Sequence, residues 1–213
     1  ASIDASLYLT NTLLESRDED EIREIRNSLK GAEAGLQSVR HMIASLQTYT
    51  QKGIRGFHEE DLVRTTRAVV ELARTKLPPD MTVDFEAPET LNCFFNPHLL
   101  NPAILNLIDN GSDACGGKGR IQVSISNGNN EVLIQVRDNG SGIPPEIQAR
   151  IWEPYFTTKG TEKGTGLGLW MVKRAVEVEH KGKVWFDTGP EGTAFCMRLP
   201  KLQKPSYKIF PCP

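Results

Sequence analysis

The chain has 213 residues, of which 38% are hydrophobic and 24% are charged, and its formal net charge is −2. This composition is typical of a soluble globular protein of one or two domains. The small net charge gives no reason to expect nucleic acid or an anionic membrane as a partner. No apolar run approaches the roughly 18 residues that cross a bilayer, and no signal-peptide pattern is present, so we predict no membrane contact within this chain.

The four cysteines are Cys93, Cys115, Cys196 and Cys212, which are far apart and form no CxxC pair. A disulfide framework is not expected in a chain of this size with so few cysteines. We predict free thiols in a reducing cytosol and therefore a cytoplasmic location.

Residues 1–52 have a helical pattern. From Ile22 to Leu46, apolar residues recur with alternating spacings of three and four, which is an a/d heptad held for four repeats. A polar segment, Glu15–Asp20, separates this helix from a shorter one with Ile3 and Leu7 on a similar face. The pattern predicts an αα-hairpin.

The two predicted helices differ in length. The second has about 30 residues and spans about 45 Å, whereas the first has only about 15. The apolar seam from Leu36 to Leu46 would then lack an intrachain partner. Either the first helix continues upstream in the parent protein, or a second chain covers the seam. Since a single hairpin buries too little to be stable, we predict a homodimer through residues 1–50, as a four-helix bundle.

The rest of the chain mixes helices, strands and hairpins. Helices are expected over residues 59–77, 98–115, 144–151 and 168–179. Strands are expected over residues 82–86, 91–95, 121–126, 131–137, 183–187 and 193–199. An irregular loop is expected over residues 153–165, and a tail or linker over residues 201–213. This order predicts an α+β fold, a two-layer α/β sandwich with helices on one face of a mixed sheet.

Asn106 and Asn110 lie four residues apart on the predicted long helix, so both point to one face. Amide oxygens suit a hard cation such as Mg²⁺, which keeps waters and also binds phosphate oxygens. By itself the pair is better explained as the polar outer side of a helix.

Asp138 follows an apolar strand and precedes Asn139-Gly140-Ser141-Gly142. A carboxylate held at a glycine turn can accept a hydrogen bond from an exocyclic amine such as that of adenine, and the glycines let the base approach the backbone. An ordinary Asp-Asn-Gly turn is the alternative.

Gly164-Thr165-Gly166-Leu167-Gly168-Leu169 precedes an apolar helix. Backbone N–H groups at a helix N-terminus bind phosphate. The run is neither a dinucleotide-binding motif nor a P-loop, because no strand leads directly into it and the lysine-serine pair is missing.

Four motifs follow one another at residues 106–110, 138–143, 152–159 and 164–169. In this order they closely resemble the N box, the first glycine box, the phenylalanine box and the second glycine box of sensor histidine kinases of two-component systems, within the GHKL superfamily. Gly192-Thr193 resembles the small last motif of that family. The resemblance implies a catalytic ATP-binding domain over residues 57–200, with the Bergerat-type fold, and a dimerisation and phosphotransfer domain over residues 1–52.

The resemblance also implies ATP and Mg²⁺ as cofactors. Asn110 would coordinate the magnesium ion that bridges the phosphates, and Asn106 would help to hold it. Asp138 would bind the adenine amine, Gly140 and Gly142 would shape the base pocket, and Thr193 would support the adenine.

Phe156 would anchor a lid over residues 153–165. Lys159 is either a phosphate contact or a solvated lid residue. The second glycine box would bind the nucleotide through Gly164, Gly166, Leu167 and Gly168, with Gly166 and Gly168 cradling the phosphates.

Asn106 separates branches of the superfamily. Chaperone, gyrase and mismatch-repair ATPases carry a glutamate there that activates water, and an amide cannot act as that general base. Asn106 is therefore also our catalytic candidate. The sequence favours transfer of the γ-phosphoryl group to a histidine, and then to an aspartate of a response-regulator receiver domain, over hydrolysis.

The acceptor histidine of the family is missing. Ala1–Leu7 aligns with the acceptor segment through Ile3 and Leu7, which puts Ala1 at the histidine position. Either the histidine was removed or replaced, or the protein is a degenerate nucleotide-binding homologue, not a kinase, that acts through protein contacts. The remaining histidines are expected to be surface or capping residues: His41, His58, His98 and His180. A membrane anchor upstream of residue 1 is compatible with this assignment.

Overall fold

A computed structural model describes residues 56–159 and 165–201. The predicted hairpin over residues 1–52, Gly164, His41, Cys212 and nearly all of the predicted tail lie outside these residues. The chain divides into two units, of which one comprises residues 1–47 and 158–164 and the other residues 48–157 and 165–213. All the helices and strands described below belong to the second unit.

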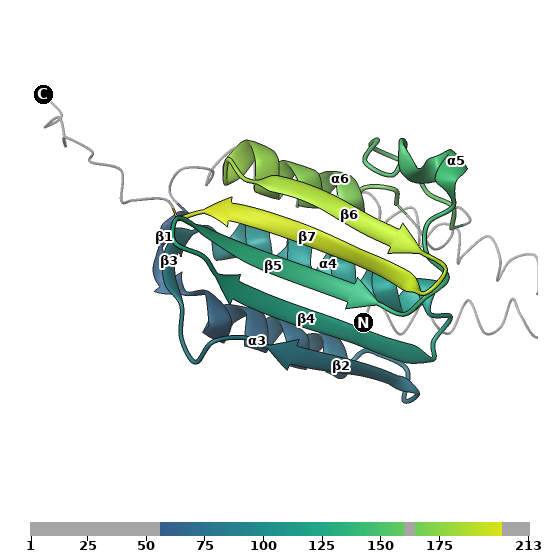
Figure 1. Ribbon diagram of the computed structural model, residues 1–213, viewed down its shortest axis with the longest axis horizontal. Coiled ribbons are helices and arrows are strands. Elements are labelled where there is room, and N and C mark those ends of the chain that lie inside the picture. Colours follow the sequence, from purple (N-terminus) through teal and green to yellow (C-terminus); the bar gives the residue numbers. More distant parts are fainter. Residues whose placement is uncertain (1–55, 160–164, 202–213) are drawn as a thin grey trace, which may run out of the picture. The chain divides into compact units, whose positions relative to one another are not determined.

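A five-stranded mixed sheet runs through this unit in the order β2-β4-β5-β7-β6 (Figure 1). Its strands are β2 (Met81–Glu86), β4 (Gly119–Asn127), β5 (Glu131–Asp138), β6 (Lys183–Gly189) and β7 (Gly192–Pro200). β2 is parallel to β4, and the other neighbours are antiparallel. A smaller antiparallel pair joins β1 (His58–Asp61) to β3 (Asn92–Phe95).

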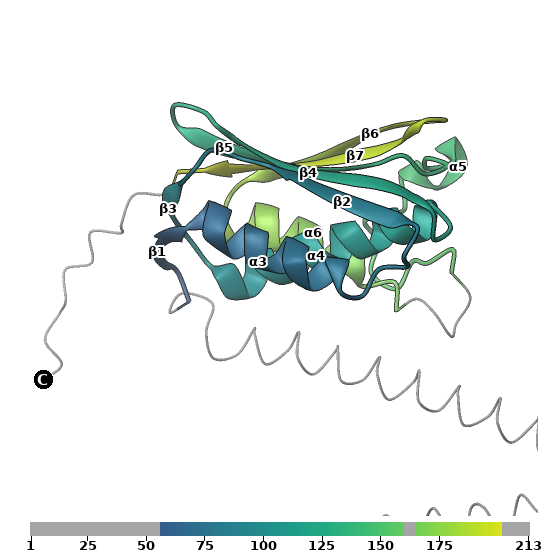
Figure 2. The same ribbon diagram turned by 90° about the horizontal axis from the view of Figure 1, so that it is seen from below.

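The helices cover one face of the large sheet. α3 (Leu62–Arg74), α4 (Pro97–Ala114) and α6 (Gly168–Lys173) form the second layer, and α6 continues as the π-helix η1 (Arg174–Glu179) (Figure 2). The short α5 (Pro145–Gln148) lies near one end of the sheet. The predicted two-layer α+β fold is confirmed for this part of the chain.

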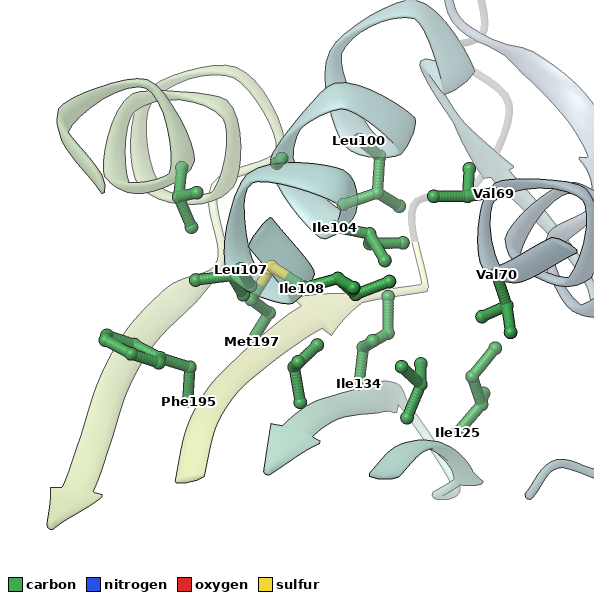
Figure 3. Close-up of a cluster of buried hydrophobic side chains, with 14 of the residues drawn as sticks. Val69, Val70, Leu100, Ile104, Leu107, Ile108, Ile125, Ile134, Phe195 and Met197 are labelled. Carbon is green, nitrogen blue, oxygen red and sulfur yellow. The ribbon is translucent and has the colours of Figure 1, made fainter. Parts of the chain in front are cut away.

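The main core lies between α3, α4 and the sheet. Alternate residues of β5 are buried, namely Val132, Ile134 and Val136, because successive side chains of a strand point to opposite faces. Side chains of α4, including Ile104, Leu107 and Ile108, point toward Ile134 and Met197 of the sheet (Figure 3). This packing fixes α4 against the middle of the sheet.

The first helix of the layer begins three residues later than the sequence predicts. Residues 58–61 pair with β3 instead, and the Asp61 carboxylate caps the helix by accepting hydrogen bonds from the Val63 N–H at 2.9 Å and the Arg64 N–H at 3.4 Å. The same oxygen accepts the Leu91 N–H at 3.1 Å. Since Leu91 is far away in the sequence, local pattern does not show this boundary.

His180 was expected to be a surface or capping residue; it does cap the end of η1, but it is buried and not on the surface. Its ring is 1% exposed and lies 4.8 Å from the Phe57 ring. Burial lowers the pKa of His180, and the neutral ring uses both nitrogens. Nδ1 donates to the Ala175 carbonyl at 2.7 Å, and Nε2 accepts the Asn96 N–H at 3.1 Å. The His180 N–H also donates to Ala175, five residues back, at 3.1 Å, which is the π-helical spacing.

Three cysteines, Cys93, Cys115 and Cys196, are free thiols. Burial raises the pKa of Cys93 to about 11 and also raises the pKa of the other two, so all three are protonated at neutral pH. None of the helices within residues 56–159 and 165–201 has the length and apolarity that a bilayer crossing requires.

Leu100 and Leu72 test the assignment of the core. Leu100 on α4 is 0% exposed, whereas Leu72 on α3 is 47% exposed. Leu100→Ala is expected to reduce the free energy of unfolding by about 2–5 kcal/mol, since it leaves a cavity, and Leu72→Ala by less than about 1 kcal/mol. Urea unfolding of the full chain followed by tryptophan fluorescence measures both, because all three tryptophans lie in this unit. Equal losses would contradict the packing described here.

Candidate functional site

Asp138 is the last residue of β5, and it is 5% exposed. It continues the inward alternation of Val132, Ile134 and Val136, so its carboxylate lies on the side of the sheet that α4 covers. Thr193 lies at the start of β7 and faces the same side, in step with the buried Phe195 and Met197. The sheet thus places these two polar side chains at one end of a largely apolar face.

Backbone N–H groups hold the Asp138 carboxylate. Its Oδ1 accepts the Gly140 N–H at 2.9 Å and the Thr193 N–H at 3.2 Å. Burial raises the pKa of Asp138 above its ordinary value, against the opposing effect of these N–H groups. Because both N–H groups use Oδ1, the second oxygen can accept a hydrogen bond from an amine of a ligand.

Glycines let the backbone pack closely around this carboxylate. A Cβ on Gly140 would lie 2.7 Å from the backbone of Ala114 at the end of α4. Gly142 has a φ of +76°, and a Cβ there would overlap the carbonyl oxygen of Gly189. Gly192 has a φ of +122°, and a Cβ there would overlap the carbonyl oxygen of Asp138. Only glycine fits these positions without strain.

α4 brings the two asparagines to the same region. Asn106 and Asn110 are half-buried on this helix. A Cβ on Gly111, the next residue, would lie 3.1 Å from the Asp138 Cβ, so the helix passes close to the carboxylate. A Cβ on Gly168 would lie 3.5 Å from the Asn106 Oδ1, which places the first residue of α6 against Asn106.

The predicted lid is described only in part. Phe156 packs on the hydrophobic core, and the Arg150 guanidinium lies 4.5 Å from the centre of its ring. Gly166 has a φ of +64°, and its backbone packs so closely on Tyr155 that a Cβ would overlap it. Leu167 is buried. Residues 160–164, which include Gly164, lie outside the described residues. The structure assigns no role to Gly164 or to Lys159, which precedes this segment.

Thr188 joins the site although sequence analysis did not select it. Its Oγ1 accepts the Ile143 N–H at 2.9 Å and lies 3.0 Å from the Thr193 Oγ1. A single threonine at the end of a strand matches no functional sequence motif. The available signal was the position of Thr188 and Thr193 on either side of Gly189-Pro190-Glu191-Gly192, since a hairpin with this turn pairs the two.

Comparison with known proteins identifies the family. The family model described as "Histidine kinase-, DNA gyrase B-, and HSP90-like ATPase" matches residues 96–203, which is half of the chain. The chain belongs to this ATPase family. The match begins at the N-cap of α4 and therefore includes the asparagines, Asp138, both glycine motifs and Thr193.

Its relatives place the domain among the sensor histidine kinases. The chain is 35% identical to nitrogen regulation protein NtrY of Azorhizobium caulinodans over 147 residues, which is 66% of this chain and 18% of that protein. It is 40% identical to sporulation kinase A of Bacillus subtilis over 103 residues, which is 48% of this chain and 16% of that protein. The chain thus spans less than a fifth of the length of either relative.

Solved structures agree. The catalytic domain of histidine kinase ThkA superposes with a TM-score of 0.63 and 31% identity, covering 68% of this chain and 95% of that one. The predicted resemblance is thus confirmed: residues of this chain form the catalytic ATPase domain of a two-component sensor histidine kinase. In this family the domain binds ATP, which fits a buried carboxylate beside a glycine-lined turn.

Asp138→Asn is expected to change the stability of this domain and its affinity for ATP in opposite directions. In the folded protein the pKa of Asp138 is raised above the ordinary 3.8. The folded state therefore binds this proton more tightly than the unfolded state does. The buried charge destabilises the folded state to its full extent only at a pH above the raised pKa. Asparagine keeps an oxygen for both N–H groups and removes that charge. At pH 7 we expect an unfolding midpoint about 2–4 °C higher and ATP affinity lower by about tenfold or more.

Thermal unfolding by tryptophan fluorescence, with and without Mg-ATP, measures both effects. The stability gain should shrink as the pH falls through the raised pKa toward 3.8 and should be absent below it. Asp187→Asn, on the exposed side of β6, is the matched control and should change neither quantity. Unchanged ATP affinity in Asp138→Asn would rule out Asp138 as the carboxylate that binds the base.

Proposed function

We propose that this domain binds ATP as its magnesium complex and transfers the γ-phosphoryl group to a histidine. From there the group passes to an aspartate of a response-regulator receiver domain. The observation that carries the proposal is the buried Asp138 carboxylate, which two backbone N–H groups hold at the end of β5 beside α4. An oriented, desolvated acceptor of this kind suits the exocyclic amine of adenine.

The asparagines of α4 supply the proposed metal site. Within the described residues, no group of three or more His, Cys, Asp or Glu side chains could hold a metal ion. Mg²⁺ needs no such cage, because it keeps several waters and takes other oxygens from the phosphates. The amide oxygens of Asn110 and Asn106 fit this role as hard ligands. When bound, the ion would neutralise charge on the phosphates.

Asn106 favours transfer over hydrolysis. A hydrolase of this superfamily needs a general base near the γ-phosphate, and the Asn106 amide takes up no proton near neutral pH. Gly168 packs directly against this amide and begins the helix that follows the second glycine motif. We infer that Gly166 and Gly168 approach the phosphates, while Asn106 positions them without activating water.

The partners follow from the same assignment. ThkA, whose catalytic domain resembles this one, has been solved in complex with the response regulator TrrA. We propose a receiver domain as the partner of this kinase as well. We propose a homodimer through residues 1–50, because an a/d heptad of this length requires a second apolar surface. We also propose a cytoplasmic location, because the proposed substrate ATP is available there.

Asn110→Ala tests the metal site. The variant should bind ATP about tenfold more weakly in the presence of Mg²⁺, because one hydrogen-bonding or metal-binding group is lost. Its affinities with Mg²⁺ and with EDTA should become nearly equal, whereas the wild type should prefer the magnesium complex. Titration calorimetry with ATP measures all four affinities. Asn129→Ala, in the exposed turn between β4 and β5, is the control and should behave like the wild type.

A second experiment tests phosphoryl transfer. Incubated with magnesium and ATP labelled at the γ-phosphate, the present chain should acquire no acid-labile, base-stable phosphate at position 1, because the Ala1 side chain has no nucleophile. Ala1→His should acquire one, and Ala1→His with Asn110→Ala should acquire much less. Labelling of the present chain at position 1 would contradict this prediction. Failure of Ala1→His to label while it still binds ATP would favour the nucleotide-binding homologue that is not a kinase.

A further inference from the structure

Three polar side chains form a row across β5, β7 and β6. In the antiparallel register Thr188 of β6 pairs with Thr193 of β7, and Asp138 of β5 follows Arg137, which pairs with Ala194. All three lie on the side of the sheet that the helices cover, in step with the buried Val136, Phe195 and Val184. The row therefore ends at the carboxylate to which the adenine amine is assigned.

One of the two hydrogen bonds of Thr188 has a fixed direction, and in the other either hydroxyl can donate. Thr188 Oγ1 accepts the Ile143 N–H at 2.9 Å, and 3.0 Å separates it from the Thr193 Oγ1. A hydroxyl group has one proton to donate. If Thr188 gives its proton to Thr193, both of its bonds are satisfied inside the protein. The Thr193 hydroxyl, which then accepts from Thr188, has its own proton left for a ligand.

We propose that Thr188 is a specificity-determining residue of the nucleotide site, which acts by orienting the Thr193 hydroxyl as a hydrogen-bond donor. This inference rests on the proposed ATP site. Together with the Asp138 carboxylate, the oriented hydroxyl presents an acceptor beside a donor. Because Thr188 contacts the turn and Thr193 and acts through the Thr193 hydroxyl, it is a positioning residue.

An acceptor beside a donor is complementary to one edge of adenine. Adenine offers an exocyclic amine that donates and a neighbouring ring nitrogen that accepts. Guanine offers a carbonyl oxygen and a ring N–H at the same places, so the two roles are reversed. Against guanine, the Asp138 carboxylate would face an oxygen and the Thr193 proton would face another proton. A buried polar group left without a partner in this way is a strong basis for rejection.

The Ile143 N–H couples this row to the first glycine motif. Ile143 follows Gly142, whose backbone lies against Gly189 at the end of β6. A Cβ on Gly142 would also lie 3.2 Å from the Thr188 Oγ1. Thr188 thus contacts both walls of the base pocket, the glycine turn on one side and Thr193 on the other.

The test compares affinities for Mg-ATP and Mg-GTP in the full chain by titration calorimetry. Thr188→Val keeps the shape of the side chain but removes the hydroxyl, so the preference for ATP should fall about tenfold. Thr188→Ser keeps the hydroxyl and should retain the preference for ATP of the wild type. Thr82→Val, at an exposed position of β2, is the matched control and should leave the preference unchanged. If Thr188 only stabilised the fold, Thr188→Val would lower the affinities for Mg-ATP and Mg-GTP by the same factor. That result would overturn the proposal.

A double-mutant cycle identifies the route of the effect. Thr193→Val should reduce the preference for ATP as Thr188→Val does, and the two substitutions together should reduce it no further, because the first removes the group through which the second acts. Additive losses of ATP preference in the double variant would overturn the proposal. An unchanged ATP preference in Thr193→Val would also overturn it, and this measurement does not depend on whether the Thr188 variants fold. Wild-type chain that fails to bind Mg-ATP would overturn the proposed function as well. Binding with unchanged preference in Thr188→Val would overturn this inference alone.

Discussion

The site depends on one buried carboxylate that backbone N–H groups hold in place. Burying a charged group is unfavourable unless hydrogen bonds compensate for the lost water. Asp138 receives two of them on Oδ1, from Gly140 and Thr193. Burial nevertheless raises its pKa, so the compensation is incomplete. The domain therefore carries a local instability, which a ligand amine would relieve by completing the set of hydrogen-bond partners. Such trade-offs between stability and activity are common at functional sites.

The geometry around this carboxylate explains why the motifs are so rich in glycine. Gly140, Gly142 and Gly192 each lie where a Cβ would meet backbone atoms of another segment. The turn after β5, the end of α4 and the hairpin between β6 and β7 can therefore approach one another closely. α4 then serves two purposes, since its apolar side chains pack on the sheet while the half-buried Asn106 lies against the start of α6 and Gly111 lies close to Asp138. In the proposed function, the Asn106 amide of this helix positions the phosphates and does not activate water.

Periodicity and turn chemistry predicted most of the elements. The strand pairs β4–β5 and β6–β7 and the long helix α4 are where alternation, glycine and proline indicated them. The failures have a common cause. The start of α3 is decided by pairing between residues 58–61 and β3, and the burial of His180 by Asn96 and Phe57, far away in the sequence. Thr188 was missed for the same reason, because its importance comes from Ile143 and Thr193 and not from its own neighbours.

The sequence by itself determined the fold class, the family and the residue types of the site. The motifs and their order contain the residue types that the chemistry requires, and they can be recognised from the sequence without coordinates. Only the tertiary structure decided which of these groups meet and in what state. Strand alternation and helix packing place Asp138 on the covered side of the sheet, where loss of water raises its pKa. Register between β6 and β7 brings Thr188 to Thr193. Distances across the sheet, burial and the direction of hydrogen bonds depend on packing between segments that are far apart in the chain, and the pattern of any one segment does not contain them.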